Sequence, residues 1–271
     1  MTRKQPPLEE ILKDVLPEEL LEFVPRSYDT IGDIIVMKIP EELEDYKKQV
    51  GEAFIKAYPY IKTVLNQTGP IENEFRTRPL EFISGENKRS TLYKEFDCIF
   101  HVDVEKAYFS PRLSNERGRI MELVKDGEKI LNMFAGIGTF SIIIARHKRT
   151  EVYSVEKNPE AYHLMMKNIE RNKLKGEVKP VLEDAKNFIK EGYFDRIIMP
   201  LPERANEFLE QAFANAKNRG IIHYHDFCRE FEEVEEKLAR LKLKYKINDK
   251  KIIRSYGPGI YHVVMDLEVN K

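Results

Sequence analysis

From Glu128 onward, the sequence alternates regularly between short apolar segments and longer amphipathic segments. The apolar segments have the length of buried strands, and the amphipathic segments carry apolar residues at helical spacing. Repeated alternation of this kind predicts a parallel sheet that is covered by helices on both faces. The predicted strands are residues 129–134, 151–156, 177–183, 195–200 and 220–227, and the predicted helices are residues 159–174, 204–217 and 229–242.

The end of the sequence departs from this alternation. The segment KIIRSYGPGIYHVVMDLEV, residues 251–269, has the pattern of two strands around a Pro-Gly turn. Methyltransferase-type sheets carry a closing antiparallel hairpin of this kind, and dehydrogenase sheets usually do not. We therefore expect an α/β fold, namely a Rossmann-like class I methyltransferase sheet with an antiparallel carboxy-terminal hairpin.

The first part of the sequence follows a different pattern. GDIIVMKI and IKTVLNQT predict short strands around a helical stretch, and LEFISG, TLYKEF and CIFHVDV alternate like one antiparallel sheet. SNERGRIMELV predicts a helix that is capped by Ser114 or Asn115. We expect a short amino-terminal segment (residues 1–30), a smaller α+β domain (31–126) and the parallel-sheet domain (127–271).

The stretch NMFAGIGTF, residues 132–140, follows a predicted strand and opens a predicted helix. Gly136 and Gly138 lack side chains, so the backbone can turn tightly there and approach a ligand. The dinucleotide-binding pattern needs a third glycine at position 141, where Ser141 stands. The loop therefore favours S-adenosylmethionine, which has no phosphate, over a pyrophosphate ligand.

Two acidic residues follow at the ends of the next two predicted strands. A carboxylate at Glu156 can accept ribose hydroxyl protons, as the acid of dinucleotide-binding folds does. Asp184 is placed to meet the adenine amino group. Sheets of this class bind ligands beyond the carboxyl ends of their strands, so these residues predict a cofactor site. An ordinary strand–helix turn and a solvated strand end are the structural alternatives.

Composition excludes several other classes of protein. No apolar run approaches the ~20 residues that span a bilayer, and no secretion signal opens the sequence, so a cytoplasmic protein is expected. Cys98 and Cys228 offer neither metal spacing nor a disulfide framework. The histidines lack ligand spacing, so no metal is expected, and His223 and His225 of HYH point to one strand face in a structural role. The net charge of -1 excludes a globally basic protein but not a local basic patch.

Two stretches, KAYFSPRLSNERGRIM (106–121) and NMFAGIGTFSI (132–142), resemble the archaeal-eukaryotic tRNA guanine-37 N1-methyltransferases. EFRTRPLEF, EKNP, IIMPLP, IIHYH and RSYGPGIYHVVMDLEV support the resemblance, which covers roughly residues 70–271. It implies S-adenosyl-L-methionine as cofactor, tRNA as partner through its anticodon loop, with tRNA-Phe as the expected species, and a monomer. It also implies that the α+β domain binds the RNA substrate. The tRNA-elbow module of many relatives is expected to be absent or much reduced, because only about 30 residues precede the predicted strand near Gly32.

The resemblance assigns roles to individual residues. Glu116 is similar to the general base that removes the guanine N1 proton, which N1 holds at neutral pH. Arg76 is similar to the group that stabilises negative charge on guanine O6, with Arg78 as a rival. Arg117 would support these charges or contact phosphate, and Tyr108 would lie near the target base and the cofactor. The residues expected at the cofactor are Phe134, Ala135, Gly136, Gly138, Glu156, Asp184, Pro200 and Arg112.

The stretch DRIIMPLPER, residues 195–204, differs from the family pattern. The family commonly has Asn-Leu-Pro after the fourth strand, and this chain has Pro200, Leu201 and Pro202, which are expected at the substrate base. Pro200 offers neither a polar side chain nor a backbone N–H, so one hydrogen bond to the guanine edge is lost. An archaeal branch with Pro here also methylates C7 of 4-demethylwyosine, the tricyclic wyosine precursor. The resemblance thus implies dual specificity, with a simple strand terminator as the alternative.

Other functions and structural roles stay open at this point. The alternatives are an aminocarboxypropyl transferase with the same cofactor, an NAD-dependent oxidoreductase, and a catalytically silent RNA-binding scaffold. Glu116 could instead complement a helix dipole, Arg76 could form a surface ion pair, and Tyr108 could belong to the core. The basic segments KRSTLYKEF and KKIIRSY are candidates for salt-sensitive contacts with tRNA phosphates.

Overall fold

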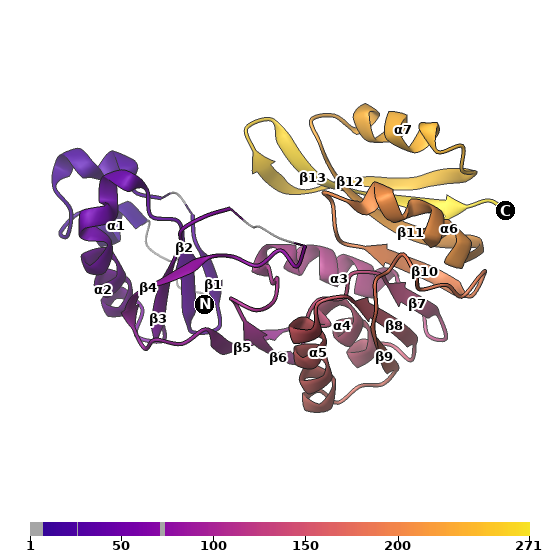
Figure 1. Ribbon diagram of the computed structural model, residues 1–271, viewed down its shortest axis with the longest axis horizontal. Coiled ribbons are helices and arrows are strands. Elements are labelled where there is room, and N and C mark those ends of the chain that lie inside the picture. The colour runs from indigo at the N-terminus through magenta and orange to yellow at the C-terminus, as the bar shows by residue number, and fades with distance from the viewer. Residues whose placement is uncertain (1–7, 26, 71–73) are drawn as a thin grey trace. The chain divides into compact units, whose positions relative to one another are not determined.

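The computed structural model describes residues 8–25, 27–70 and 74–271 (Figure 1). The described chain divides into two compact units, with residues up to 94 and 100–111 in the first and residues 95–99 and 112–271 in the second. This boundary lies before the one expected near residue 126, because helix α3 (Ser114–Leu123) packs on helix α4 (Thr139–His147). Among the described residues, no helix has both the length and the apolar character needed to cross a membrane.

The first unit contains a four-stranded sheet in the order β1-β2-β3-β4. β2 and β3 are parallel, since helix α2 carries the chain from one to the other, and the outer pairs are antiparallel. Leu12 and Leu16, from the expected separate segment 1–30, belong to the core of this unit. The elements are α1 (Leu8–Leu12), η1 (Glu18–Phe23), β1 (Asp29–Ile31), β2 (Ile34–Met37), η2 (Glu41–Tyr46), α2 (Lys47–Ala57), β3 (Thr63–Gln67) and β4 (Leu80–Gly85).

Strands β5 (Ser90–Glu95) and β6 (Cys98–Asp103) form a separate two-stranded sheet. The prediction that they continue one antiparallel sheet with residues 80–85 is wrong, because β4 pairs with β3. The chain turns away from β4 at Gly85, which has a φ of +90°. A Cβ at Gly85 would lie 2.1 Å from the Lys62 carbonyl oxygen, so only glycine allows this turn.

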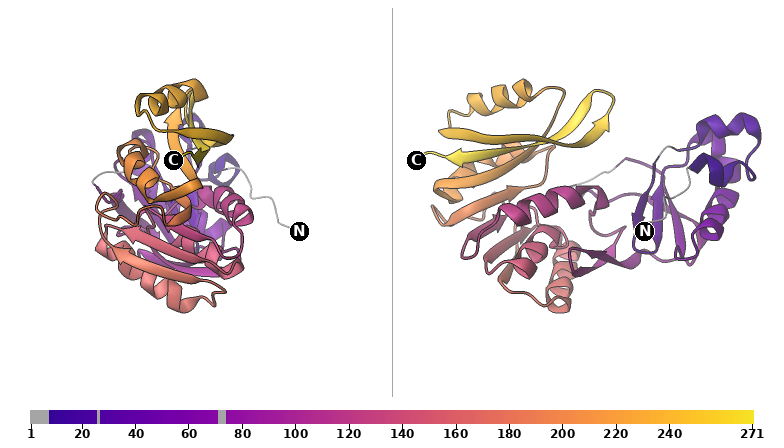
Figure 2. Two further views of the ribbon diagram at one scale, coloured as in Figure 1. Left: turned by 90° about the vertical axis from the view of Figure 1, so that its right-hand side faces the viewer. Right: turned by 180° about the vertical axis from the view of Figure 1, so that it is seen from behind.

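The second unit contains a seven-stranded sheet in the order β12-β13-β11-β10-β7-β8-β9 (Figures 1 and 2). Neighbouring strands from β11 to β9 are parallel, and β13 is antiparallel to both β11 and β12. The predicted α/β sheet with an antiparallel carboxy-terminal hairpin is therefore confirmed. The strands are β7 (Lys129–Asn132), β8 (Glu151–Glu156), β9 (Glu177–Leu182), β10 (Phe194–Met199), β11 (Ala216–Cys228), β12 (Tyr245–Gly257) and β13 (Ile260–Val269).

Helices cover both faces of this sheet, as its strand order requires. The chain moves outward from β7 to β9 and then in the opposite direction from β10 to β11, so right-handed crossovers place the connecting helices on opposite faces. The order reverses between β7 and β10, and the carboxyl ends of these two strands mark the ligand crevice of such sheets. The remaining helices are α5 (Pro159–Arg171), η4 (Ala205–Phe208), α6 (Leu209–Asn215) and α7 (Phe231–Arg240).

Helix α3 begins differently from the prediction. The N-cap position is Leu113, not Ser114 or Asn115, and no side-chain hydrogen bond caps the helix. The 3₁₀ turn η3 (Pro111–Leu113) leads directly into α3, so Ser114 is already the first helical residue. Helix α5 starts as predicted, with Pro159 at its first position and the Asn158 side chain accepting a hydrogen bond from Glu160 N.

Candidate functional site

A tight glycine turn joins β7 to α4 at the carboxyl edge of the large sheet. Gly136 and Gly138 have φ values of 56° and 88°, which favour glycine over any residue with a side chain. A Cβ on Gly138 would lie 2.9 Å from Met165 Cγ, so helix α5 also closes the space around the turn. Ala135 N donates to the Val155 carbonyl oxygen at 2.9 Å, which ties the turn to β8.

Glu156, the last residue of β8, closes this turn with its carboxylate. Its Oε2 accepts from Gly136 N at 2.6 Å and its Oε1 accepts from Asn158 N at 2.7 Å. Burial raises the pKa of Glu156, although the N–H groups of Asn158 and Gly136 oppose that shift. The backbone N–H of Lys157 also opposes the shift, so an ionised carboxylate with about four acceptor positions keeps one for a hydroxyl donor.

A second carboxylate lies beyond the end of β9. Asp184 Oδ1 accepts from Lys186 N at 2.9 Å, and Oδ2 pairs with Lys157 Nζ at 2.9 Å. The hydrogen bond from the Lys186 backbone, with support from Lys157, lowers the pKa of Asp184 against the effect of burial. Since β8 pairs with β9 and Glu156 lies opposite Leu182, the two predicted cofactor carboxylates lie at neighbouring strand ends.

Ser141, which replaces the third glycine of the dinucleotide pattern, is fully buried under the turn. Its hydroxyl accepts from Asn132 Nδ2 at 3.1 Å and is hydrogen-bonded to the hydroxyl of Ser154 at 2.7 Å. Ser141 therefore fastens α4 to both β7 and β8. This contact gives the departure from the glycine pattern a structural reason.

We expect Ser141→Gly to lower the free energy of unfolding by about 1–3 kcal/mol, because Asn132 and Ser154 lose a buried partner. Urea unfolding followed by circular dichroism measures the change. Ser141→Ala serves as the control, since it removes the hydroxyl but keeps helix propensity, and it should show most of the loss. A Ser141→Gly protein as stable as the wild type would contradict this structural role.

Pro200 follows the last residue of β10, next to the strand that leads into the glycine turn. Met133 N donates to the Ile198 carbonyl oxygen at 3.1 Å, so the two strand exits are held together. The Phe134 ring packs edge-on against Phe208 at 4.8 Å. Pro200 and Leu201 are partly buried and Pro202 is buried, so these residues form a stiff exit from the strand.

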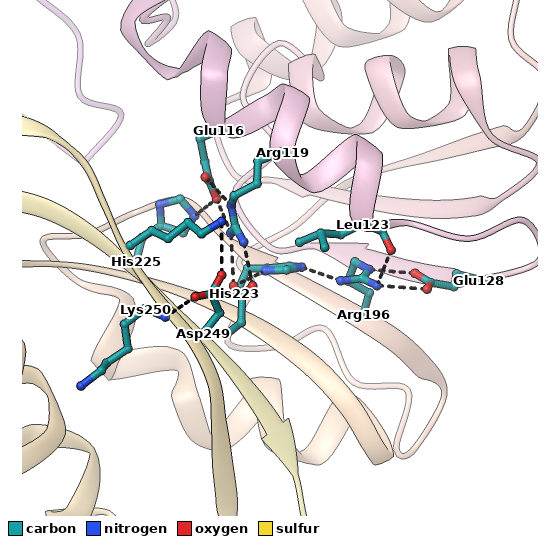
Figure 3. A network of polar contacts seen from close by, with 11 residues as sticks. Glu116, Arg119, Leu123, Glu128, Arg196, His223, His225, Asp249 and Lys250 are labelled. Carbon is teal, nitrogen blue, oxygen red and sulfur yellow. Dashed lines mark hydrogen bonds and ion pairs between the residues drawn. The ribbon is translucent and has the colours of Figure 1, made fainter.

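Glu116, the predicted general base, lies in the first turn of α3 and is 4 % exposed. Its two oxygens accept from Arg119 Nε and Nη2 at 2.8 and 2.7 Å (Figure 3). Arg119 also donates to Asp266 of β13 at 2.7 and 3.2 Å, so one guanidinium is shared between two carboxylates. His225 Nε2 lies 3.7 Å from Glu116 Oε1. The carboxylate thus has a fixed orientation and unused acceptor positions.

A chain of polar contacts continues across the sheet through His223 and Arg196 to Glu128 (Figure 3). Asp266 Oδ1 lies 2.6 Å from His223 Nδ1, and Arg196 Nη1 lies 2.8 Å from His223 Nε2. Arg196 forms two hydrogen bonds with Glu128, at 2.7 and 3.0 Å. Because Arg196 can only donate, His223 is the neutral tautomer with its proton on Nδ1, and burial lowers the pKa of His223 in agreement.

Arg117 does not extend toward solvent. It is 2 % exposed, and its Nε and Nη2 donate to Glu95 at 2.8 and 2.7 Å. Burial of the guanidinium in this ion pair corrects the expectation of a phosphate contact. The pair fixes the position of α3.

Three predicted residues belong to the first unit or to the turn before α3. The Arg76 guanidinium lies 4.1 Å from the centre of the Tyr108 ring, and Arg76 has a φ of 56°. Arg78, its rival, pairs with Asp29 at 3.2 Å and donates to the Phe109 carbonyl oxygen at 3.1 Å, which is a structural role. Arg112 is exposed on η3.

Arg119, Asp266, Arg196 and Glu128 were not predicted as members of the site. Arg196 and Asp266 did carry a signal, since each is a charged residue within an otherwise apolar predicted strand, and such residues are rarely buried without a partner. Among the described residues, no group of three or more His, Cys, Asp or Glu side chains is arranged to hold a metal ion.

The strand order, the antiparallel strand β13 and the glycine turn define the fold of the Rossmann-like class I methyltransferases. A family model described as the TRM5/TYW2 methyltransferase domain matches residues 91–253, and a model described as the TYW2 N-terminal domain matches residues 8–88. The chain belongs to the TRM5/TYW2 methyltransferase family. The predicted resemblance is confirmed at this level.

Three relatives carry different activities in their names. The chain is 38% identical to the tRNA (guanine(37)-N(1))-methyltransferase Trm5b of Pyrococcus abyssi, over 94% of this chain and 78% of the relative. It is 35% identical to the tRNA(Phe) (4-demethylwyosine(37)-C(7)) aminocarboxypropyltransferase of Pyrococcus horikoshii, over 98% of both. It is 32% identical to the tRNA (guanine(37)-N(1))/4-demethylwyosine(37)-methyltransferase Taw22 of Nanoarchaeum equitans, over 90% of this chain and 96% of the relative.

The fold also matches a solved structure described as the complex of aTrm5 and tRNALeu. The TM-score is 0.89 at 34% identity, over 98% of this chain and 79% of that chain. These four proteins are tRNA-modifying enzymes by name or are described with tRNA, so the NAD-dependent oxidoreductase alternative has no support.

Proposed function

We propose that this protein is an S-adenosylmethionine-dependent tRNA methyltransferase that modifies N1 of guanosine 37. The glycine turn at Gly136 and Gly138 fits the cofactor, because these two residues have no side chains and the Glu156 carboxylate at the turn keeps one acceptor position for a ribose hydroxyl. Asp184 would accept from the adenine amino group, and Phe134, Ala135, Pro200 and Arg112 would complete the site. The bound cofactor supplies an electrophilic methyl group.

The observation that carries this proposal is the placement of Glu116. Guanine N1 is a poor nucleophile until its proton is removed, so the reaction needs a base with a fixed orientation. Arg119 holds both Glu116 oxygens, and Asp266 shares the charge of Arg119. The network holds three carboxylates and two guanidiniums, and His223 is neutral, so its net charge is one negative charge, which the N1 proton would neutralise. Its charged members are Glu116, Asp266, Glu128, Arg119 and Arg196. Arg76 and Tyr108 keep the roles that the resemblance gives them, at guanine O6 and near the target base.

Nucleoside mass spectrometry tests the proposal directly. We expect a tRNA transcript with guanosine at position 37 to gain one methyl group on N1 when it is incubated with the protein and S-adenosylmethionine. A tRNA transcript with adenosine at that position is the control and should remain unmodified. A product that carries the heavier aminocarboxypropyl group, or no product, would contradict N1 methylation.

A second candidate activity rests on Pro200 and on the names of the relatives. An enzyme without the Asn side chain at this position would accept 4-demethylwyosine as well as guanosine, and methylate its C7. Aminocarboxypropyl transfer to the same carbon is the competing reaction, because one such enzyme aligns with nearly the whole chain. tRNA-Phe that carries 4-demethylwyosine is the substrate that separates the two, since the added masses differ.

We expect Pro200→Asn to shift the preference toward guanosine by roughly 5- to 150-fold in kcat/KM, because a specific contact to a base edge contributes about 1–3 kcal/mol of discrimination. The comparison uses matched tRNA-Phe substrates with guanosine or 4-demethylwyosine. Pro200→Ala, which removes the ring without adding a polar group, is the control. An unchanged preference in Pro200→Asn would mean that Pro200 only ends the strand.

A further inference from the structure

An aromatic stack lies at one end of the β11, β12 and β13 strands. The rings of Phe227 and Tyr256 are 4.2 Å apart and tilted by only 32°, and Phe227 packs against His262 at 5.2 Å. Tyr256 is 52% exposed, whereas Phe227 is half-buried and His262 is buried. We call Tyr256, Phe227 and His262 the hairpin stack. The Tyr256 ring is exposed to solvent, and Phe227, which packs on His262, supports its other face.

Strand register places the hairpin stack at the carboxyl edge of the large sheet. Cys228, the last residue of β11, pairs with Tyr261, and Tyr261 also pairs with Ser255 of β12. The turn between β12 and β13 therefore lies where β11 ends. The glycine turn after β7 and Pro200 after β10 lie at the carboxyl ends of strands parallel to β11. The exposed ring and the predicted cofactor crevice thus share one edge of the sheet.

A continuous line of rings connects the hairpin stack to Glu116. His262 and His225 are 5.2 Å apart, and His262 Nε2 lies 3.1 Å from His225 Nδ1. His225 in turn reaches within 3.7 Å of Glu116 Oε1. Burial and the neighbouring His262 and His223 lower the pKa of His225, so the ring next to Glu116 is uncharged. The exposed end of the line is next to a cation, because the Arg254 guanidinium lies 5.6 Å from the centre of the Tyr256 ring.

We propose that Tyr256 is a stacking platform for an unpaired nucleobase of the RNA substrate, in the loop that carries the target base. The inference rests on the proposed function. Every base has a π-face, so a supported aromatic ring binds a base without selecting its identity, and a nearby arginine attracts the flanking phosphate. The line of rings leads to the general base, so a stacked neighbour would hold the target nucleotide in register with Glu116.

Binding and kinetics of Tyr256→Ala test the platform. Loss of one stacked base weakens RNA binding by roughly 5- to 150-fold, so we expect Kd and KM for tRNA to rise within that range. Tyr256→Phe keeps the ring and should bind like the wild type. Tyr60→Ala is the matched control, because Tyr60 is 51% exposed but lies in the first unit. S-adenosylmethionine affinity should be the same in all of these variants.

Fluorescence of 2-aminopurine separates stacking from an indirect effect. Placed at each position of the anticodon loop in turn, this base should be quenched by the wild type at one position and not by Tyr256→Ala. Unchanged Kd and KM in Tyr256→Ala, with unchanged quenching, would overturn the platform while leaving the methylation proposal intact. Loss of RNA binding in Tyr256→Ala, in a protein that methylates no guanosine, would instead support the platform and overturn the methylation proposal.

Discussion

Glu116→Gln is expected to slow methyl transfer to guanosine 37 by about 10²- to 10⁴-fold, the usual contribution of a general base. Glutamine keeps an oxygen that can accept from Arg119, so the geometry of α3 should survive, but it cannot take the N1 proton. Single-turnover rates with saturating tRNA and S-adenosylmethionine measure the effect. Because the change acts on the chemical step, kcat should fall while the Kd values for both ligands stay near those of the wild type.

Glu122→Gln is the matched control for this experiment. Glu122 is exposed on the same helix, and its replacement removes the same charge without touching the network. Thermal unfolding of both variants shows whether Glu116→Gln is folded under the conditions of the assay. A folded Glu116→Gln protein that methylates at the wild-type rate would remove Glu116 from the mechanism.

Asp266→Asn is expected to lower the free energy of unfolding by about 3–5 kcal/mol at neutral pH, the range for breaking a buried ion pair. Burial alone would raise the pKa of Asp266, but the His223 N–H and the Arg119 guanidinium outweigh burial and hold that pKa well below its usual range. A depressed carboxyl pKa contributes stability above the unfolded-state value of about 3.9 and loses it as the pH falls toward the folded-state value. The difference between variant and wild type should therefore shrink below about pH 4.

Urea unfolding of both proteins at several pH values measures this difference. Glu268→Gln is the control on the same strand, since Glu268 faces an exposed arginine, Arg219, at 3.5 Å and should change stability little. An Asp266→Asn protein with wild-type stability at neutral pH, or with a deficit that does not depend on pH, would contradict the role of Asp266 as a buried charged partner.

Much of the large sheet could be predicted because its signals are local. Within residues 129–156, two apolar segments of strand length flank a segment with helical spacing. Pro159 after Asn158 marks the start of the next helix. Where local signals are ambiguous, pairing with neighbours decides the structure. The predicted helix 204–217 ends at Asn215 because Ala216 pairs with Phe194 of β10, so β11 begins earlier than expected.

The candidate site was predictable only in part, because local sequence patterns do not determine which distant side chains meet. Glycines and carboxylates at strand ends follow from the order of elements, so Gly136, Gly138, Glu156 and Asp184 could be named in advance. The direction of a side chain on α3 depends on what packs against that helix. Arg117 follows Glu116 directly, yet it is buried against Glu95, while Arg119 holds Glu116. Asp266 is 147 residues from Arg119, and no local pattern connects them.

The position of β13 inside the sheet has a consequence for how the protein matures. This strand follows every other strand in sequence order, yet it is inserted between β11 and β12 and carries Asp266 to Arg119. During synthesis the glycine turn and helix α3 leave the ribosome long before Asp266 exists. A nascent chain that lacks β13 has the residues of the glycine turn but lacks the Asp266 contact to Arg119, so we expect the proposed support of Glu116 to be complete only after this strand has been translated.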